Sequence, residues 1–165
     1  MGQFPTVKAG KRITDILLGN IIPWTVTKPS DQSVTSSTTL GNDNDLLFTA
    51  VANGTYDFLC FVSYEGGTRG SSDLKFQWSI PSGSMKFGAI FNNTVPTLVL
   101  NHGSASGSMT AGSNGAGSNL ALIMAGTFTI GVTGGTAVLQ WAQGTGSGTA
   151  TKVHAGSGLW IAESS

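Results

Sequence analysis

The sequence predicts an all-β fold: an antiparallel jelly-roll sandwich of about 8–10 strands, preceded by an N-terminal arm with one short helix. Three observations predict it. From Trp24 onward, apolar and polar residues alternate with the period of two that is typical of strands. Short apolar runs recur at regular spacing between turn signals rich in Gly, Asn and Pro. Hydrophobic residues make up 39% of the chain and charged residues only 10%, a balance that argues against disorder and against a helical bundle.

The first predicted unit is an arm of residues 1–23. Its residues 12–23 are the single helical candidate, because Thr14 suits an N-cap and Pro23 ends the apolar repeat. The apolar residues fall on adjacent stripes of a helix that is too short to be stable alone. We therefore expect the arm to dock on its own domain, on a sister subunit or on another protein. The residues expected at this docking contact are Phe4, Lys8, Lys11, Arg12, Ile13, Leu17, Leu18, Ile21 and Ile22.

The second predicted unit, residues 24–165, is the sandwich. Its strand candidates are residues 24–28, 33–40, 46–51, 56–64, 74–80, 85–91, 95–100, 120–131, 136–143 and 157–162. In the run 56–64, Leu59 and Phe61 face away from the other apolar residues, so both faces of this strand are largely apolar. Aromatic residues in strands favour packing in a core or between subunits. Those expected to pack in this way are Phe58, Phe76, Trp78, Trp141 and Trp160.

Two Gly/Ser-rich runs, residues 102–119 and 144–150, predict exposed loops. In the run Asn42–Asp45, Asp43 and Asp45 alternate with Asn, as oxygen ligands of Ca²⁺ do. The glycine and the distal glutamate of an EF-hand loop are missing, however, and Asn and Asp also favour turns for conformational reasons. A turn is therefore preferred to a metal site here.

The sequence carries no catalytic constellation. Neither His102 nor His154 has a second ligand at metal-binding spacing, and the chain lacks a nucleophile elbow and a phosphate-binding loop. Cys60 lies within a predicted strand, where a buried and inert thiol is expected. We therefore expect a protein that is not an enzyme and that takes no cofactor.

Bulk properties limit the partners. The net charge is zero, which argues against nucleic acid as a ligand. No apolar run is long enough for a membrane helix, and residues 1–10 lack the apolar core of a secretory signal, so we expect assembly in a cytoplasm. Because a neutral surface does not oppose self-association, we expect a subunit of an assembly rather than a solitary monomer.

Several blocks together resemble one family. The opening resembles the N-terminal arm of small virion structural proteins, of the minor tail or decoration type, in tailed phages of actinobacteria. It runs from Phe4-Pro5 through Ala9-Gly10-Lys11-Arg12-Ile13-Thr14 and Leu17-Leu18 to Ile21-Ile22-Pro23. Lys11 stands where that family commonly has Gln, and Gly19 where it commonly has Asn. Further similar blocks lie at residues 26–46, at Tyr56, at 73–83 and at 156–161.

The resemblance implies a virion protein that is assembled in the host cytoplasm, with a trimeric body of the C1q/TNF-like jelly-roll kind. We expect a homotrimer whose arm binds other virion proteins, either of the tail or of the major capsid. At a tail tip or fibre, the loops 102–119 and 144–150 would meet the host envelope, with a cell-surface glycan as a further partner. One alternative is a capsid decoration protein that stabilises the head, and another is a carbohydrate-binding lectin that acts alone.

Overall fold

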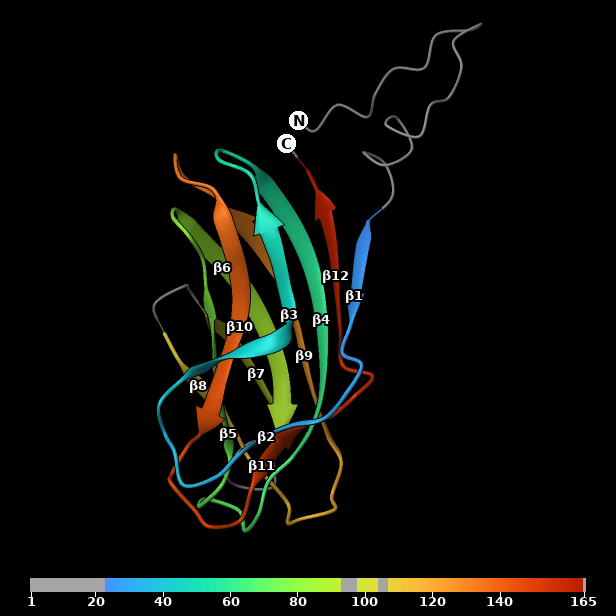
Figure 1. Ribbon diagram of the computed structural model, residues 1–165, viewed down its shortest axis with the longest axis vertical. Coiled ribbons are helices and arrows are strands. Elements are labelled where there is room, and N and C mark those ends of the chain that lie inside the picture. The colour runs from blue at the N-terminus through green and yellow to red at the C-terminus, as the bar shows by residue number, and fades with distance from the viewer. Residues whose placement is uncertain (1–22, 93–97, 104–106, 165) are drawn as a thin grey trace, which may run out of the picture.

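The computed structural model describes residues 23–92, 98–103 and 107–164, and over these ranges the chain is all-β. Two antiparallel sheets face each other in an elongated sandwich (Figure 1). The predicted all-β class with two antiparallel sheets is thus confirmed. The strands are β1 (Trp24–Thr27), β2 (Gln32–Val34), β3 (Gly41–Ala50), β4 (Thr55–Glu65), β5 (Leu74–Ser79), β6 (Ser84–Asn92), β7 (Leu98–Gly103), β8 (Met109–Ala111), β9 (Leu120–Thr129), β10 (Gly135–Gln143), β11 (Thr151–Val153) and β12 (Gly158–Glu163).

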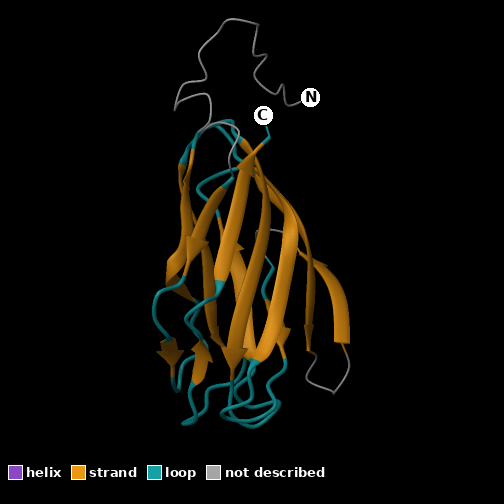
Figure 2. Ribbon diagram, turned by 90° about the vertical axis from the view of Figure 1, so that its right-hand side faces the viewer, coloured by secondary structure: helices purple, strands orange, loops and turns teal. Residues whose placement is uncertain are grey.

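The two sheets differ in size. The larger has eight strands in the order β1-β12-β4-β9-β6-β7, with β11 joining β4 to β2. The smaller has four strands in the order β3-β10-β5-β8. The long strands of both sheets run along the long axis of the body (Figure 2). Since β4 is paired on one side with β9 and on the other with β12 and β11, it is a central strand, as the sequence predicts.

The core lies between the sheets and is built on aromatic side chains. The ring centroids of Phe58 and Phe128 are 4.4 Å apart, and Trp78 meets both rings at 5.3 Å and 5.1 Å. Trp78 and Phe128 come from different sheets, so this cluster ties the layers together. Offset and edge-on ring pairs stabilise a fold beyond the area that they bury. The alternation of β4 explains the arrangement, because every second side chain from Tyr56 to Tyr64 is buried.

The structure corrects several predicted boundaries. Of the candidate strand 33–40 only Ser33 and Val34 lie in a strand, β2, and the run Asn42–Asp45, expected as a turn, belongs to β3. There the pairing with β10 shifts: Asn42 pairs with Gln140 whereas Leu47 pairs with Val138, so β3 bulges in between. Inside the predicted loop 102–119 lies β8, which pairs with β5. The predicted loop 144–150 contains no strand.

Part of the prediction falls beyond the described residues. The short helix and the docking residues Phe4, Lys8, Lys11, Arg12, Ile13, Leu17, Leu18, Ile21 and Ile22 lie outside them. The described part begins at Pro23, which directly precedes β1 at one edge of the larger sheet.

Candidate interaction surface

The outward face of the eight-stranded sheet carries a stripe of large apolar side chains. Two neighbouring cross-strand rows form it, and we call them together the apolar face. The first row runs through Trp160, Leu59, Ala125 and Gly88, and the second through Gly158, Phe61, Ile123 and Ile90. The large side chains are exposed to these extents: Leu59 47%, Phe61 44%, Trp160 41%, Ile90 39% and Ile123 38%.

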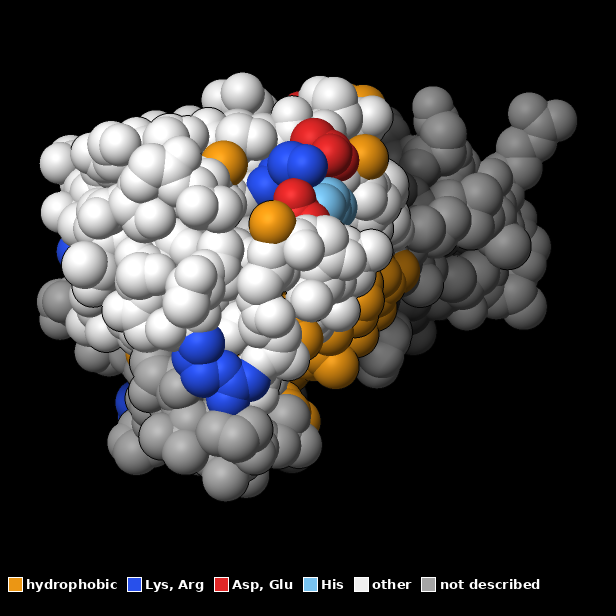
Figure 3. Space-filling model, turned by 90° about the horizontal axis from the view of Figure 1, so that it is seen from below, with side chains coloured by type: hydrophobic (Ala, Val, Ile, Leu, Met, Phe, Trp, Pro, Cys, Tyr) orange, Lys and Arg blue, Asp and Glu red, His pale blue; other side chains and the backbone are white. Residues whose placement is uncertain are grey.

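None of the side chains in these rows is charged, and the indole N–H of Trp160 is the single hydrogen-bonding group among them. The outward face of an antiparallel sheet in water normally carries polar residues at alternate positions. The side chains here are neighbours on adjacent strands, so the exposed apolar surface is contiguous rather than scattered. A contiguous apolar patch on a soluble protein marks a site where another molecule binds. Hydrophobic side chains are visible along this side of the molecule from below (Figure 3).

Charged side chains border the apolar face at both ends of its strands. Beyond one end, Asp57, Thr127 and Lys86 form the next cross-strand row, and the Thr127 hydroxyl donates a 2.7 Å hydrogen bond to Asp57. Beyond the other end, Lys152 pairs with Glu65 at 2.9 Å. This apolar centre with a charged rim is the usual anatomy of a protein interface.

The outward face of the smaller sheet is different. Its centre is a ladder of amides, in which the Gln77 side chain donates to Gln140 and the Gln140 side chain donates to Asn42, each at 2.8 Å. Lys75 lies beside this ladder and donates to the carbonyl of Thr38 at 3.2 Å. The centre of this face thus consists of hydrogen-bonded amides where the larger sheet presents apolar side chains, so the two outer faces of the sandwich are chemically unlike.

A buried charge network occupies the bulge of β3. Both side chains of the Lys28–Asp43 pair are fully buried, with Nζ 2.9 Å from Oδ1, and Asp45 accepts a second bond from Nζ at 2.9 Å. The remaining oxygen of Asp43 accepts from Trp141 Nε1 at 3.0 Å. Asp43 Oδ1 also accepts from the backbone N–H of Asp45 and of Leu46. The acidic pair considered for Ca²⁺ is therefore engaged by a lysine from the sandwich itself.

A second charged cluster lies at the lower end of the molecule, where acidic, basic and histidine side chains meet (Figure 3). Lys152 approaches Glu65 and also Asp31, and His154 lies 3.5 Å from Asp31 and 3.9 Å from Glu65. The hydrogen bond from Lys152 holds the pKa of Glu65 below its ordinary value, and the backbone N–H of Ala155 lowers the pKa of Asp31. The cluster links the loop after β1 to the ends of β4 and β11.

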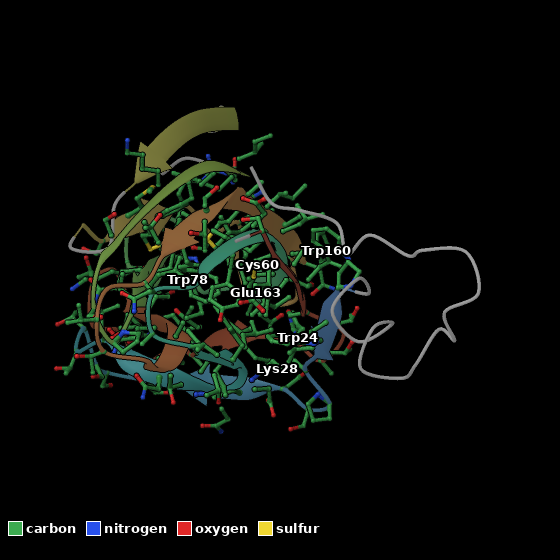
Figure 4. All side chains as sticks on the ribbon, turned by 90° about the horizontal axis from the view of Figure 1, so that it is seen from above. Trp24, Lys28, Cys60, Trp78, Trp160 and Glu163 are labelled. Carbon is green, nitrogen blue, oxygen red and sulfur yellow. The ribbon has the colours of Figure 1, made fainter. Side chains whose placement is uncertain are left out.

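The predicted packing residues separate into two groups. Phe58, Phe76, Trp78 and Trp141 are buried in the core, as predicted. Trp160 is not buried, because alternation along β12 turns it outward. Core packing is therefore excluded for Trp160, and packing against another subunit stays a prediction. Figure 4 shows Trp160 and Trp24 on the side of β1, away from Trp78 and Cys60 in the interior.

Cys60 is a buried free thiol, as predicted, and burial raises its pKa. Ile90 and Ile123 were not singled out by sequence reasoning, although their alternation with Ala89 and Leu122 would have shown them to face outward. The partnership of Lys28 with Asp43 had no signal in the sequence.

Comparison with known proteins adds no identity: no family model and no curated protein matches the chain. Among the described residues, no group of three or more His, Cys, Asp or Glu side chains is placed to hold a metal ion. The same ranges include no helix with the length and hydropathy needed to cross a membrane.

Proposed function

We propose that this protein is a non-enzymatic structural subunit that assembles with copies of itself into a homotrimer within the virion of a tailed phage. The observation that carries self-association is the apolar face, with five large hydrophobic side chains exposed in adjacent rows. Burying such a surface removes apolar area from water, which is the main driving force of stable association. Closed symmetry among identical subunits is the commonest form of such an assembly.

The virion role is supported by the resemblance of the sequence blocks to phage structural proteins. In this proposal the arm, residues 1–23, binds the particle, and the sandwich projects from it at the tail tip or fibre, with the loop 144–150 at the end opposite the start of β1. A jelly roll of the C1q/TNF-like kind is the finer architecture that we propose for the body. Its support is the eight-stranded sheet, which presents one face to the core and one face outward.

Self-association is tested by measuring the mass of the purified chain by light scattering and native mass spectrometry. We expect three copies of the 16.9 kDa chain. Phe61→Asp places a charge in the middle of the apolar face and should give a folded monomer. The matched control is Thr49→Asp, at an exposed position on the smaller sheet, which should remain trimeric. A monomeric native chain, or trimers in the Phe61→Asp variant, would contradict the proposal.

The place in the particle is tested by immunogold labelling of intact virions with an antibody to the sandwich. We expect label at the tail end. Label spread over the head would instead identify a capsid decoration protein that uses the same arm. Particles without label would exclude a virion role and favour the free lectin.

A further inference from the structure

We infer that the copies associate with their strands parallel, about an axis that runs along the strands, so that Lys86 of one copy faces Asp57 of the next. This inference rests on the proposed self-association and assigns its orientation. The occupant of the apolar face is thus a second copy of this chain.

Lys86 and Asp57 lie in one cross-strand row at the same end of the apolar face, and both are exposed. Thr127 of β9 stands between them, so their strands are about 10 Å apart, two strand spacings. Among the described residues neither forms a salt bridge. The row therefore presents a cation on the β6 side and an anion on the β4 side, and they do not neutralise each other.

An axis along the strands keeps each residue at its own height in every copy. The β6 side of one apolar face then meets the β4 and β12 side of its neighbour, as a head-to-tail contact requires. Lys86 comes opposite the neighbour's Asp57 once in each contact of the ring. Lys86 and Asp57, which form no salt bridge among the described residues, thus pair in the assembly, while the charge-free rows beside them stack on each other.

Antiparallel stacking does not give this match. Asp57 and Glu65 lie on the same strand, four residues to either side of Phe61. Stacking two copies antiparallel about Phe61 places Asp57 opposite Glu65 of the other copy. Lys152 already pairs with Glu65 at 2.9 Å, so this lysine is not available to pair with Asp57. Antiparallel stacking thus gives Asp57 no cation, whereas the parallel arrangement gives it Lys86, and this charge complementarity favours the parallel arrangement.

The test is the effect of Lys86→Glu on the association of the full chain, measured by sedimentation over a range of concentrations. We expect the dissociation constant to rise at least about tenfold, because Lys86→Glu sets an acid opposite Asp57. The same substitution in an Asp57→Asn background should weaken association much less. Asn keeps the hydrogen bond from Thr127, so this background preserves the fold. A full charge exchange, Lys86→Glu with Asp57→Lys, should restore association.

The matched control is Lys75→Glu on the smaller sheet, which should leave association unchanged. Equal weakening by Lys86→Glu in both backgrounds, or none in either, would overturn the pairing. If Phe61→Asp still dissociates the copies in that case, self-association through the apolar face stands and only the orientation is wrong. If Phe61→Asp also has no effect, the proposed function fails as well.

Discussion

The ammonium of Lys28 lies 2.9 Å from Oδ1 of Asp43, and neither side chain has any exposure to water. Lys28 follows β1 and Asp43 lies in the bulge of β3, so the pair joins an edge of the larger sheet to an edge of the smaller one. A buried ion pair adds little compared with an apolar pair of the same shape, but removing one partner leaves an uncompensated charge. The pair therefore fixes how the two edges meet.

Lys28→Met should destabilise the fold by about 3–5 kcal/mol, because Asp43 then remains buried without its cation. Urea unfolding of the variant and of the native chain measures the difference. Lys75→Met, which removes a lysine from the surface of the smaller sheet, serves as the control and should cost well under about 1 kcal/mol. Equal stability of the two variants would show that Lys28 does not compensate Asp43.

Removing divalent cations should leave the melting temperature unchanged. Both oxygens of Asp43 are occupied, one by Lys28 and two backbone N–H groups and the other by Trp141. A cation would have to displace Lys28 to bind there. Melting curves with EDTA and with added CaCl₂ check this expectation, and a rise of several degrees in Ca²⁺ would establish the metal site instead.

The two tryptophans Trp78 and Trp160 should respond oppositely to truncation. Trp78→Ala empties the centre of the core and should cost about 3–5 kcal/mol. Trp160→Ala removes a side chain that is 41% exposed, and it should change the stability of a monomer much less. Because assembly would add to apparent stability, both are compared in the monomeric Phe61→Asp background. A loss from Trp160→Ala as large as that from Trp78→Ala would place Trp160 in the core.

Stability should fall on acidification, partly through Glu65. Its pKa is lowered in the folded chain by the hydrogen bond from Lys152. A group with a lowered folded pKa stabilises the fold above its unfolded pKa, and this contribution is lost as the pH falls through the folded pKa. Unfolding measured at pH 6 and at pH 3 should therefore show a smaller loss in Glu65→Gln than in the native chain. An identical loss would mean that Glu65 contributes nothing to the acid response.

The pattern of the sequence predicts the long strands well, because alternation reports burial directly. In β4 it predicts both the inward set and the outward positions of Leu59 and Phe61, and in β5 it predicts the burial of Phe76 and Trp78. Short strands are less accessible to this kind of reasoning. β8 and β11 have three residues each, which is too few to show a period. They are strands because a neighbouring strand pairs with each of them.

The charge network was also beyond the reach of the sequence. Asp43 and Lys28 are fifteen positions apart, and their meeting depends on the bulge that shifts the pairing of β3 with β10. Local propensity favours a turn at Asn42–Asp45, whereas the buried side chains of Asp43 and Leu46 keep this run in a strand. For Trp160 the sequence leaves both core and subunit packing open, and its position along β12 places it on the surface, which excludes the core.

The alternation of β4 has a kinetic consequence for the proposed assembly. Leu59 and Phe61 stand on a backbone that is paired on both sides and anchored from behind by buried Phe58 and Cys60. Such a surface is already ordered before a partner arrives, so little chain entropy is lost on contact. Association of the copies is expected to be a rigid-body docking without a folding step. In the proposed assembly, each newly made chain exposes this apolar face until it meets its partners, so aggregation through the same face competes with assembly at that stage.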